Sequence, residues 1–125
     1  MTDDAAFEMF FSAYVEAALF STTYDNGKRD DAPMDSVYTI EDLHVDTRAV
    51  MEREAREFYV ANYADIKVNI VRAGRDFWLT RCRHGAGFWD GDWPEAVGAR
   101  LTSAAEACGE RNLYVDDDGY VCQDA

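Results

Sequence analysis

One stretch near the N-terminus limits the possible folds of this chain more than any other feature. Within residues 4–20 the large apolar side chains recur at the spacing of a single helical face. They are Phe7, Phe10, Phe11, Tyr14, Val15 and Ala18. The pattern predicts an amphipathic helix over residues 4–20, and the rest of the chain has to cover its aromatic side.

Two more helical segments are predicted before the middle of the chain. Residues 39–42 have the spacing of a capping box, with Asp in place of the usual Glu or Gln, and predict a short helical turn over residues 40–44. A longer helix, capped by Asp46 or Thr47, is predicted to extend to Ile66, because apolar side chains again recur on one face. The polar segment between these helices and the first one is predicted to be a loop.

The second half of the chain changes to a strand-like pattern. Residues 67–75 are predicted to be mainly loop, and the β-forming residues that follow predict a β-hairpin over residues 76–89. A helix is predicted from Pro94 to Cys108, and a second hairpin with an Asp-Gly turn over residues 113–122. The predicted fold is therefore α+β: two N-terminal helices, then hairpin, helix and hairpin, with a small antiparallel sheet covered by helices on one face.

Length and charge restrict the class of protein and of partner. The 125 residues, 48% of them apolar, predict one acidic globular domain over residues 1–125. The net charge of −13 argues against direct binding of nucleic acid or of an anionic membrane, since both need cationic side chains. Three cysteines without a CxxC pair indicate reduced thiols in a cytoplasm.

The run DFWLTRCRHGAGFWD at residues 76–90 is similar to a signature in a family of small, uncharacterised proteins encoded by phages and related mobile elements. Weaker similarity over residues 13–27, 38–66 and 100–121 extends the resemblance to nearly the whole chain. The resemblance implies an accessory role in a bacterial host, hence a cytoplasmic location. It supplies no catalytic residue.

Negative side chains in the first half of the chain predict a partner-binding acidic face. Its members are Asp30, Asp31, Asp35, Glu41, Asp42, Glu52, Glu54 and Glu57. Such an array would fit a surface built for phosphates, so the expected partner is a host nucleic-acid-handling or defence protein. The function predicted first is a non-enzymatic inhibitor of that protein, similar in kind to anti-CRISPR and anti-restriction proteins, with DNA mimicry as one mode.

A second candidate surface follows from aromatic and basic residues on the predicted hairpin and just after it. Its members are Trp78, Arg81, Arg83, His84, Trp89 and Trp93. Residues 67–83 hold five basic residues and one acidic residue, a local charge of +4. Rings beside cations are typical of binding hot spots and can stack on a nucleotide, so a small-ligand or nucleotide-binding module is the alternative function. Contact between the basic segment at residues 67–83 and the acidic face of a second copy of the chain would form a homodimer.

The sequence predicts no enzyme, metal site or cofactor. The glycine-rich segment at His84 lacks the nucleophile elbow and downstream histidine of a hydrolase. The cysteines and His84 lack zinc-ligand spacing, and the aspartates at 116–118 lack the calcium-loop pattern.

Overall fold

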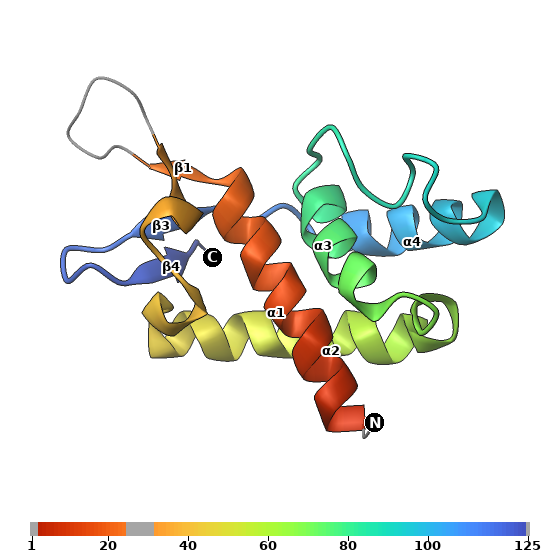
Figure 1. Cartoon of the computed structure of the whole chain (residues 1–125), viewed down its shortest axis with the longest axis horizontal. Coiled ribbons are helices and arrows are strands. Elements are labelled where there is room, and N and C mark those ends of the chain that lie inside the picture. The colour runs from red at the N-terminus through yellow and green to blue at the C-terminus, as the bar shows by residue number, and fades with distance from the viewer. Residues whose placement is uncertain (1–2, 25–31, 125) are drawn as a thin grey trace.

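The fold is a helical body that carries two short hairpins at one end (Figure 1). The computed structural model describes residues 3–24 and 32–124. The helices are α1 (Asp3–Ser21), α2 (Val45–Ile66), α3 (Ile70–Arg81) and α4 (Glu95–Ala107), with the 3-10 turns η1 (Met34–Ser36) and η2 (Ile40–Asp42). The strands form two antiparallel pairs, β1 (Thr23–Tyr24) with β2 (Ala32–Pro33), and β3 (Leu113–Val115) with β4 (Val121–Gln123).

Helix α1 is the centre of the core, and its predicted apolar stripe is confirmed. Phe7, Phe10 and Tyr14 are fully buried, and the helix is so closely surrounded that several small residues outside the stripe are buried as well. It packs most extensively against α3, where an added Cβ on Gly74 would lie 2.1 Å from the carbonyl oxygen of Phe10. The two backbones therefore approach each other at a position that only glycine can occupy.

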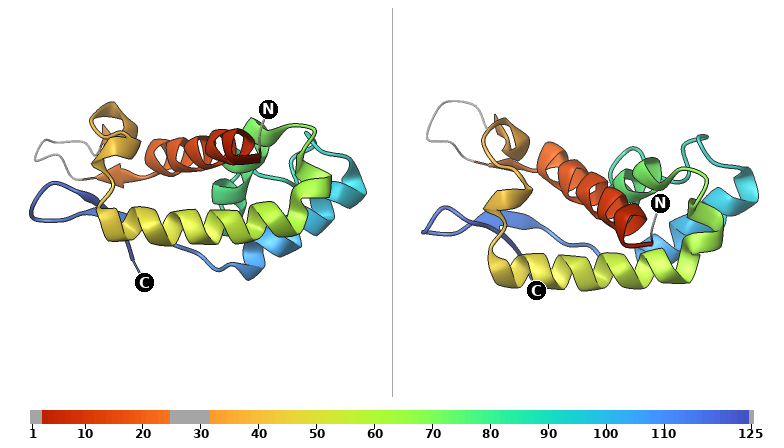
Figure 2. Two further views of the ribbon diagram at one scale, coloured as in Figure 1. Left: turned by 90° about the horizontal axis from the view of Figure 1, so that it is seen from below. Right: turned by 60° about the horizontal axis from the view of Figure 1, so that its bottom comes forward.

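Helix α2 lies beneath α1 along the long axis of the molecule (Figure 2). The ring of Phe58, on α2, stacks on the ring of Phe77, on α3, and the two ring centroids are 4.1 Å apart. The predicted capping box before it is confirmed, since Thr39 N donates to Asp42 Oδ2 at 2.7 Å. The predicted caps Asp46 and Thr47 are not the N-cap, because α2 begins at Val45 and its cap is His44.

The β-hairpin predicted over residues 76–89 is wrong, and so is the loop predicted over 67–75. Residues Ile70–Arg81 form α3, whose N-cap Asn69 accepts a hydrogen bond from Arg72 N at 3.2 Å. Its buried side has helical spacing, because Ala73, Phe77 and Arg81 each lie one turn apart. The β-forming residues Phe77, Trp78 and Thr80 that led to the hairpin prediction are buried within this helix. The segment that follows is irregular up to α4.

The C-terminal hairpin is confirmed, with Asp116 Oδ1 accepting from the amide of Tyr120 at 2.8 Å and Gly119 at a φ of 87°. The predicted sheet, made of this hairpin and the one expected over residues 76–89, is not formed. The described strands instead form two separate pairs, β1 with β2 and β3 with β4. The α+β class holds, with helices as the larger part. None of the described helices has the length and apolar content needed to cross a membrane.

Candidate functional site

The aromatic and basic residues predicted as one surface are divided between core and surface. Trp78, Trp93 and Arg81 are buried, with exposures of 1%, 7% and 1%. Both indole N–H groups are used internally: Trp78 donates to the Ser21 hydroxyl at 3.0 Å and Trp93 to Asp76 Oδ2 at 2.8 Å. Burial raises the pKa of Asp76, against the effect of that hydrogen bond.

The other three residues of that set reach the surface separately. Trp89 is 56% exposed, in the segment between α3 and α4. Arg83 donates to Glu106 Oε2 at 2.9 Å and so pairs with the end of α4. His84 is exposed beside α1. The absence of the expected hairpin explains this dispersal: Trp78 and Arg81 lie in α3, whereas the other four residues lie in the irregular segment between α3 and α4.

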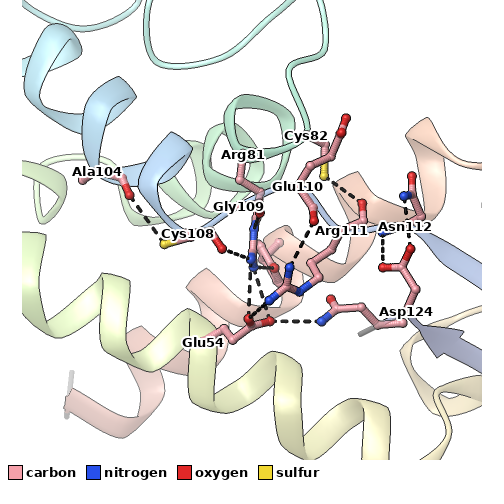
Figure 3. A network of polar contacts seen from close by, with 12 residues as sticks. Glu54, Arg81, Cys82, Ala104, Cys108, Gly109, Glu110, Arg111, Asn112 and Asp124 are labelled. Carbon is pink, nitrogen blue, oxygen red and sulfur yellow. Dashed lines mark hydrogen bonds and ion pairs between the residues drawn. The ribbon is translucent and has the colours of Figure 1, made fainter.

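Arg81 makes the most complete set of polar contacts in the core (Figure 3). Its Nε donates to the carbonyl of Gly109 at 2.8 Å, and its Nη2 donates to the carbonyl of Cys108 at 2.9 Å. Its Nη1 donates to the Tyr14 hydroxyl at 2.9 Å, and both Nη atoms reach the Glu54 carboxylate, at 3.4 and 3.5 Å. A guanidinium has five N–H donors, so these contacts use all of them.

Glu54 is the second centre of this cluster, which we call the Arg81 network together with Tyr14, Arg111 and Gln123. Glu54 Oε2 accepts from Arg111 Nη2 at 3.3 Å, and Oε1 from Gln123 Nε2 at 3.0 Å. Burial acts to raise the pKa of Glu54, but the hydrogen bond from Gln123 and the charges of Arg81 and Arg111 hold it below its usual value. The carboxylate therefore stays ionised beside its two arginines.

The Arg81 network holds the fold together. Through Tyr14, Glu54 and Arg81 it joins α1, α2 and α3, and through Gln123 it ties in β4. Burial raises the pKa of Tyr14, although Arg81 opposes this, so the phenol stays neutral. The Arg81 side chain is fully buried and that of Glu54 is 14% exposed, and both are matched by partners inside the chain, so neither is available to a ligand.

The predicted acidic face is only partly available to a partner. Asp30 and Asp31 lie outside the described residues. Asp42 and Glu52 are engaged locally, the first in the capping box and the second with Arg48 Nε at 3.2 Å. The remaining members besides Glu54 are Asp35, Glu41 and Glu57, which are exposed and have no hydrogen-bond or ion-pair partner among the described residues. They lie on three different elements, η1, η2 and α2.

A large open pocket lies over the C-terminal half of α1. It has a volume of about 960 Å³, near the upper end of the roughly 300–1,000 Å³ typical of ligand sites. Helix α1 contributes Ala17 and Phe20, residues 35–40 contribute one wall, and α3 with residues 84–86 contributes the other. Figure 1 shows α1 between η1 on one side and α3 on the other. Phe20 is 68% exposed, which is unusual for so large an apolar ring.

The hollow continues along α1 towards its N-terminus. A smaller pocket, with Met9 and Val71 in its lining, shares Ser12 and Glu16 with the larger one. We call the two together the α1 groove. Its lining is mainly apolar and includes the charged residues Glu8, Glu16, Asp35 and Arg75, together with His84. Those four charged side chains are exposed and have no hydrogen-bond or ion-pair partner in the described part of the chain.

The cysteines do not offer a reactive centre. Burial is the first cause that raises the pKa of Cys82, of Cys108 and of Cys122, so each thiol is less ionised than an ordinary one. Over residues 3–24 and 32–124 no three His, Cys, Asp or Glu side chains are grouped in a way that could hold a metal ion.

The groove brings together Asp35 and His84 from the two predicted surfaces, and adds Glu16, Phe20 and Arg75, which sequence reasoning did not select. The sequence contained a signal for the groove, because Phe20 lies outside the predicted apolar stripe of the first helix. Comparison with known protein families, characterised proteins and solved structures finds no match to this chain. The function therefore has to be argued from this geometry.

Proposed function

We propose that this protein is a non-enzymatic binding protein that occupies a basic part of a partner protein, with a nucleic-acid-handling protein of a bacterial host as the partner. The observation that carries the proposal is the surplus of unpaired carboxylates. Ion pairs between arginines and carboxylates in the described chain engage six arginines and five carboxylates, while the sequence holds 25 acidic residues. Among the described residues most carboxylates therefore have no arginine ion pair, and this uncompensated negative charge can attract a cationic partner.

The arrangement of that charge favours docking over strict imitation of a DNA backbone. Glu54 belongs to the Arg81 network and Glu52 pairs with Arg48, which leaves Glu57 as the exposed member of the predicted face on α2. Helix α2 therefore does not present a regular row of free carboxylates. The α1 groove combines free carboxylates with apolar surface, which is the combination expected at a specific binding site.

Affinity capture from a bacterial lysate tests this function. The protein and an unrelated acidic protein of similar size and net charge would be immobilised in parallel, and retained proteins identified by mass spectrometry. We expect basic nucleic-acid-binding proteins to be enriched on the support that carries this protein and not on the control support, and to be released as salt is raised. We also expect these proteins to lose their binding to nucleic acid when this protein is added to them in solution. Identical sets of retained proteins on the two supports would contradict the proposal.

A second candidate, a small amphipathic ligand, is favoured by the size of the groove and by Arg75 and His84 at its wall. Thermal unfolding with a panel of nucleotides and organic anions tests it. A ligand present at about 100 times its dissociation constant adds roughly 2.7 kcal/mol to stability. The absence of a shift with every compound would remove this candidate.

A further inference from the structure

We infer that the α1 groove is the docking site for an amphipathic helix of the partner, with an apolar face and a cationic flank. This inference rests on the proposed function, and it specifies both the surface used and the kind of segment bound.

The shape of the groove favours an elongated occupant. Its two hollows share Ser12 and Glu16 and follow α1 from Met9 to Phe20. At about 1.5 Å per residue this stretch of helix is roughly 16 Å long, which matches about three turns of a second helix laid alongside. A compact ligand would fill only the larger hollow, whereas a helix would cover both.

The floor of the groove provides places for apolar anchors. Phe20 is 68% exposed, Met9 41% and Val71 39%, and Leu79 and Ile40 are half-buried between them. A helix that docks in a groove inserts apolar residues spaced three, four and seven positions apart. The exposed apolar side chains at both ends of the groove fit such a row of anchors.

The unpaired charges of the groove determine the charge that the flank of the docked helix has to carry. Glu8 and Glu16 both line the groove from α1, eight residues or about 12 Å apart along the helix, and Asp35 lines the larger hollow. Two lysines or arginines about two turns apart on the docked helix would meet the two glutamates. Arg75, from α3, would meet an acidic residue near the middle of the segment.

Strand addition, the other common way to bind a peptide, finds little support. The strands β1 and β2 have two residues each, and β3 and β4 have three. Edges so short cannot template a stable added strand. A helix in the α1 groove is therefore the mode of peptide binding that the described surface supports best.

The test uses three synthetic peptides of about 14 residues, enough for the three turns that the groove accommodates. The first has leucines on one helical face and lysines on the flank. The second has the same composition in scrambled order, and the third has glutamate in place of lysine. Binding to the full chain is measured by fluorescence anisotropy at low and at physiological salt. We expect the first peptide to bind at least about 10-fold more tightly than either of the others.

Matched variants locate the site. Phe20→Glu is paired with Val60→Glu, because these side chains are 68% and 67% exposed but Val60 lies on α2. Glu8→Lys with Glu16→Lys is paired with Glu57→Lys and Glu110→Lys, which make the same change of charge at exposed positions outside the groove. We expect each groove variant to weaken binding of the first peptide about 10-fold or more, and each control to change it less than about 3-fold. Circular dichroism verifies that all variants fold.

The outcomes separate the two proposals. The ordered and scrambled lysine peptides could bind equally well, with equal losses in the groove and control variants. That result would overturn the α1 groove as the docking site and would leave only a general attraction for basic partners. Failure of every lysine peptide to bind at low salt would overturn the proposed function as well. Tight binding of the glutamate peptide would contradict the role given to Glu8 and Glu16.

Discussion

The Arg81 network and the α1 groove use the same kinds of side chain in opposite ways. In the network every N–H of Arg81 has an acceptor, and Glu54 is held by two arginines and Gln123. In the groove Arg75, Glu16 and the other charged side chains are exposed and without partners in the described chain, beside an uncovered phenylalanine. Charges that are paired inside the fold depend on one another, because removal of one partner is strongly destabilising, whereas charges left unpaired beside apolar surface are available for binding.

The same α3 helix supplies an arginine to each region. Arg75 and Arg81 are six residues apart, so they point to different sides of the helix. One faces the groove and the other enters the core between α1 and α2. Position on the helix, and not residue type, decides which arginine is structural.

Replacing Arg81 with methionine should be strongly destabilising. The change leaves the Tyr14 hydroxyl and two carbonyls without their donor, and leaves Glu54 with only Arg111 and Gln123. Removal of one partner of a buried ion pair costs about 3–5 kcal/mol. Urea unfolding measures the loss. Arg75→Met is the control and should stay within about 0.5 kcal/mol of the parent, as surface substitutions usually do. Equal effects of the two substitutions would remove the distinction between the regions.

Gly74→Ala should separate α1 from α3, which are the helices that contribute to both regions. Its Cβ would lie 2.1 Å from the carbonyl oxygen of Phe10, so one backbone has to move. We expect a loss of about 2–3 kcal/mol, at the upper end for overpacking. Gly85→Ala is the control, because its Cβ would meet no atom within 4 Å. A fully stable Gly74→Ala protein would show that the close approach of the helices is not required.

Glu54→Gln should destabilise the protein at neutral pH by about 2 kcal/mol, since hydrogen bonds to a charged group are lost. The pKa of Glu54 is lower in the folded than in the unfolded protein, so ionisation of Glu54 stabilises the fold above the unfolded pKa of about 4.3. That contribution is lost as pH falls through the folded pKa. The difference from the parent should therefore shrink in strong acid, as measured by urea unfolding at both pH values.

Glu57→Gln is the matched control for this pH dependence. Glu57 is exposed on the same helix and has no hydrogen-bond or ion-pair partner in the described chain. Its substitution should leave stability nearly unchanged at either pH. A constant deficit for Glu54→Gln across the whole pH range would show that the ionised state of Glu54 is not what the network requires.

Phe20→Ser should have the smallest effect on stability. The ring is already 68% exposed in the folded protein, so little apolar burial is lost, and we expect a change within about 0.5 kcal/mol. Thermal unfolding of the variant, with Phe10→Ser as a buried comparison, measures this. A loss comparable with that of Phe10→Ser would mean that Phe20 is part of the core and is not available to a partner.

Local patterns predicted those elements whose signals lie close together in the sequence. The stripe of the first helix, the capping box at Thr39 and the Asp-Gly hairpin near the C-terminus each depend on residues a few positions apart, and each is present. The third helix was missed because Phe77, Trp78 and Thr80 favour strands locally, while packing against α1 and α2 decides the outcome.

The binding surface was harder to predict for a related reason. Arginines and tryptophans are common both in binding sites and in buried polar clusters, and the sequence does not show which partner each one meets. Arg81 meets Glu54, 27 residues away, and Tyr14, 67 residues away. The larger hollow of the groove combines three regions that are separated in the chain: residues 12–21, residues 35–40 and residues 75–86. Two apolar residues of the first helix that lie outside the predicted stripe and line the groove, Met9 and Phe20, were the signal in the sequence.

The most direct test of this division is an amide NMR titration of the full chain with the leucine–lysine peptide. We predict that shifts concentrate on Ser12, Glu16, Phe20, Leu79 and Ala86 along the α1 groove. The acidic turn at residues 116–118 and the Arg81 network should remain unshifted. Shifts confined to the turn, or spread evenly over all exposed carboxylates, would contradict the groove as the binding surface.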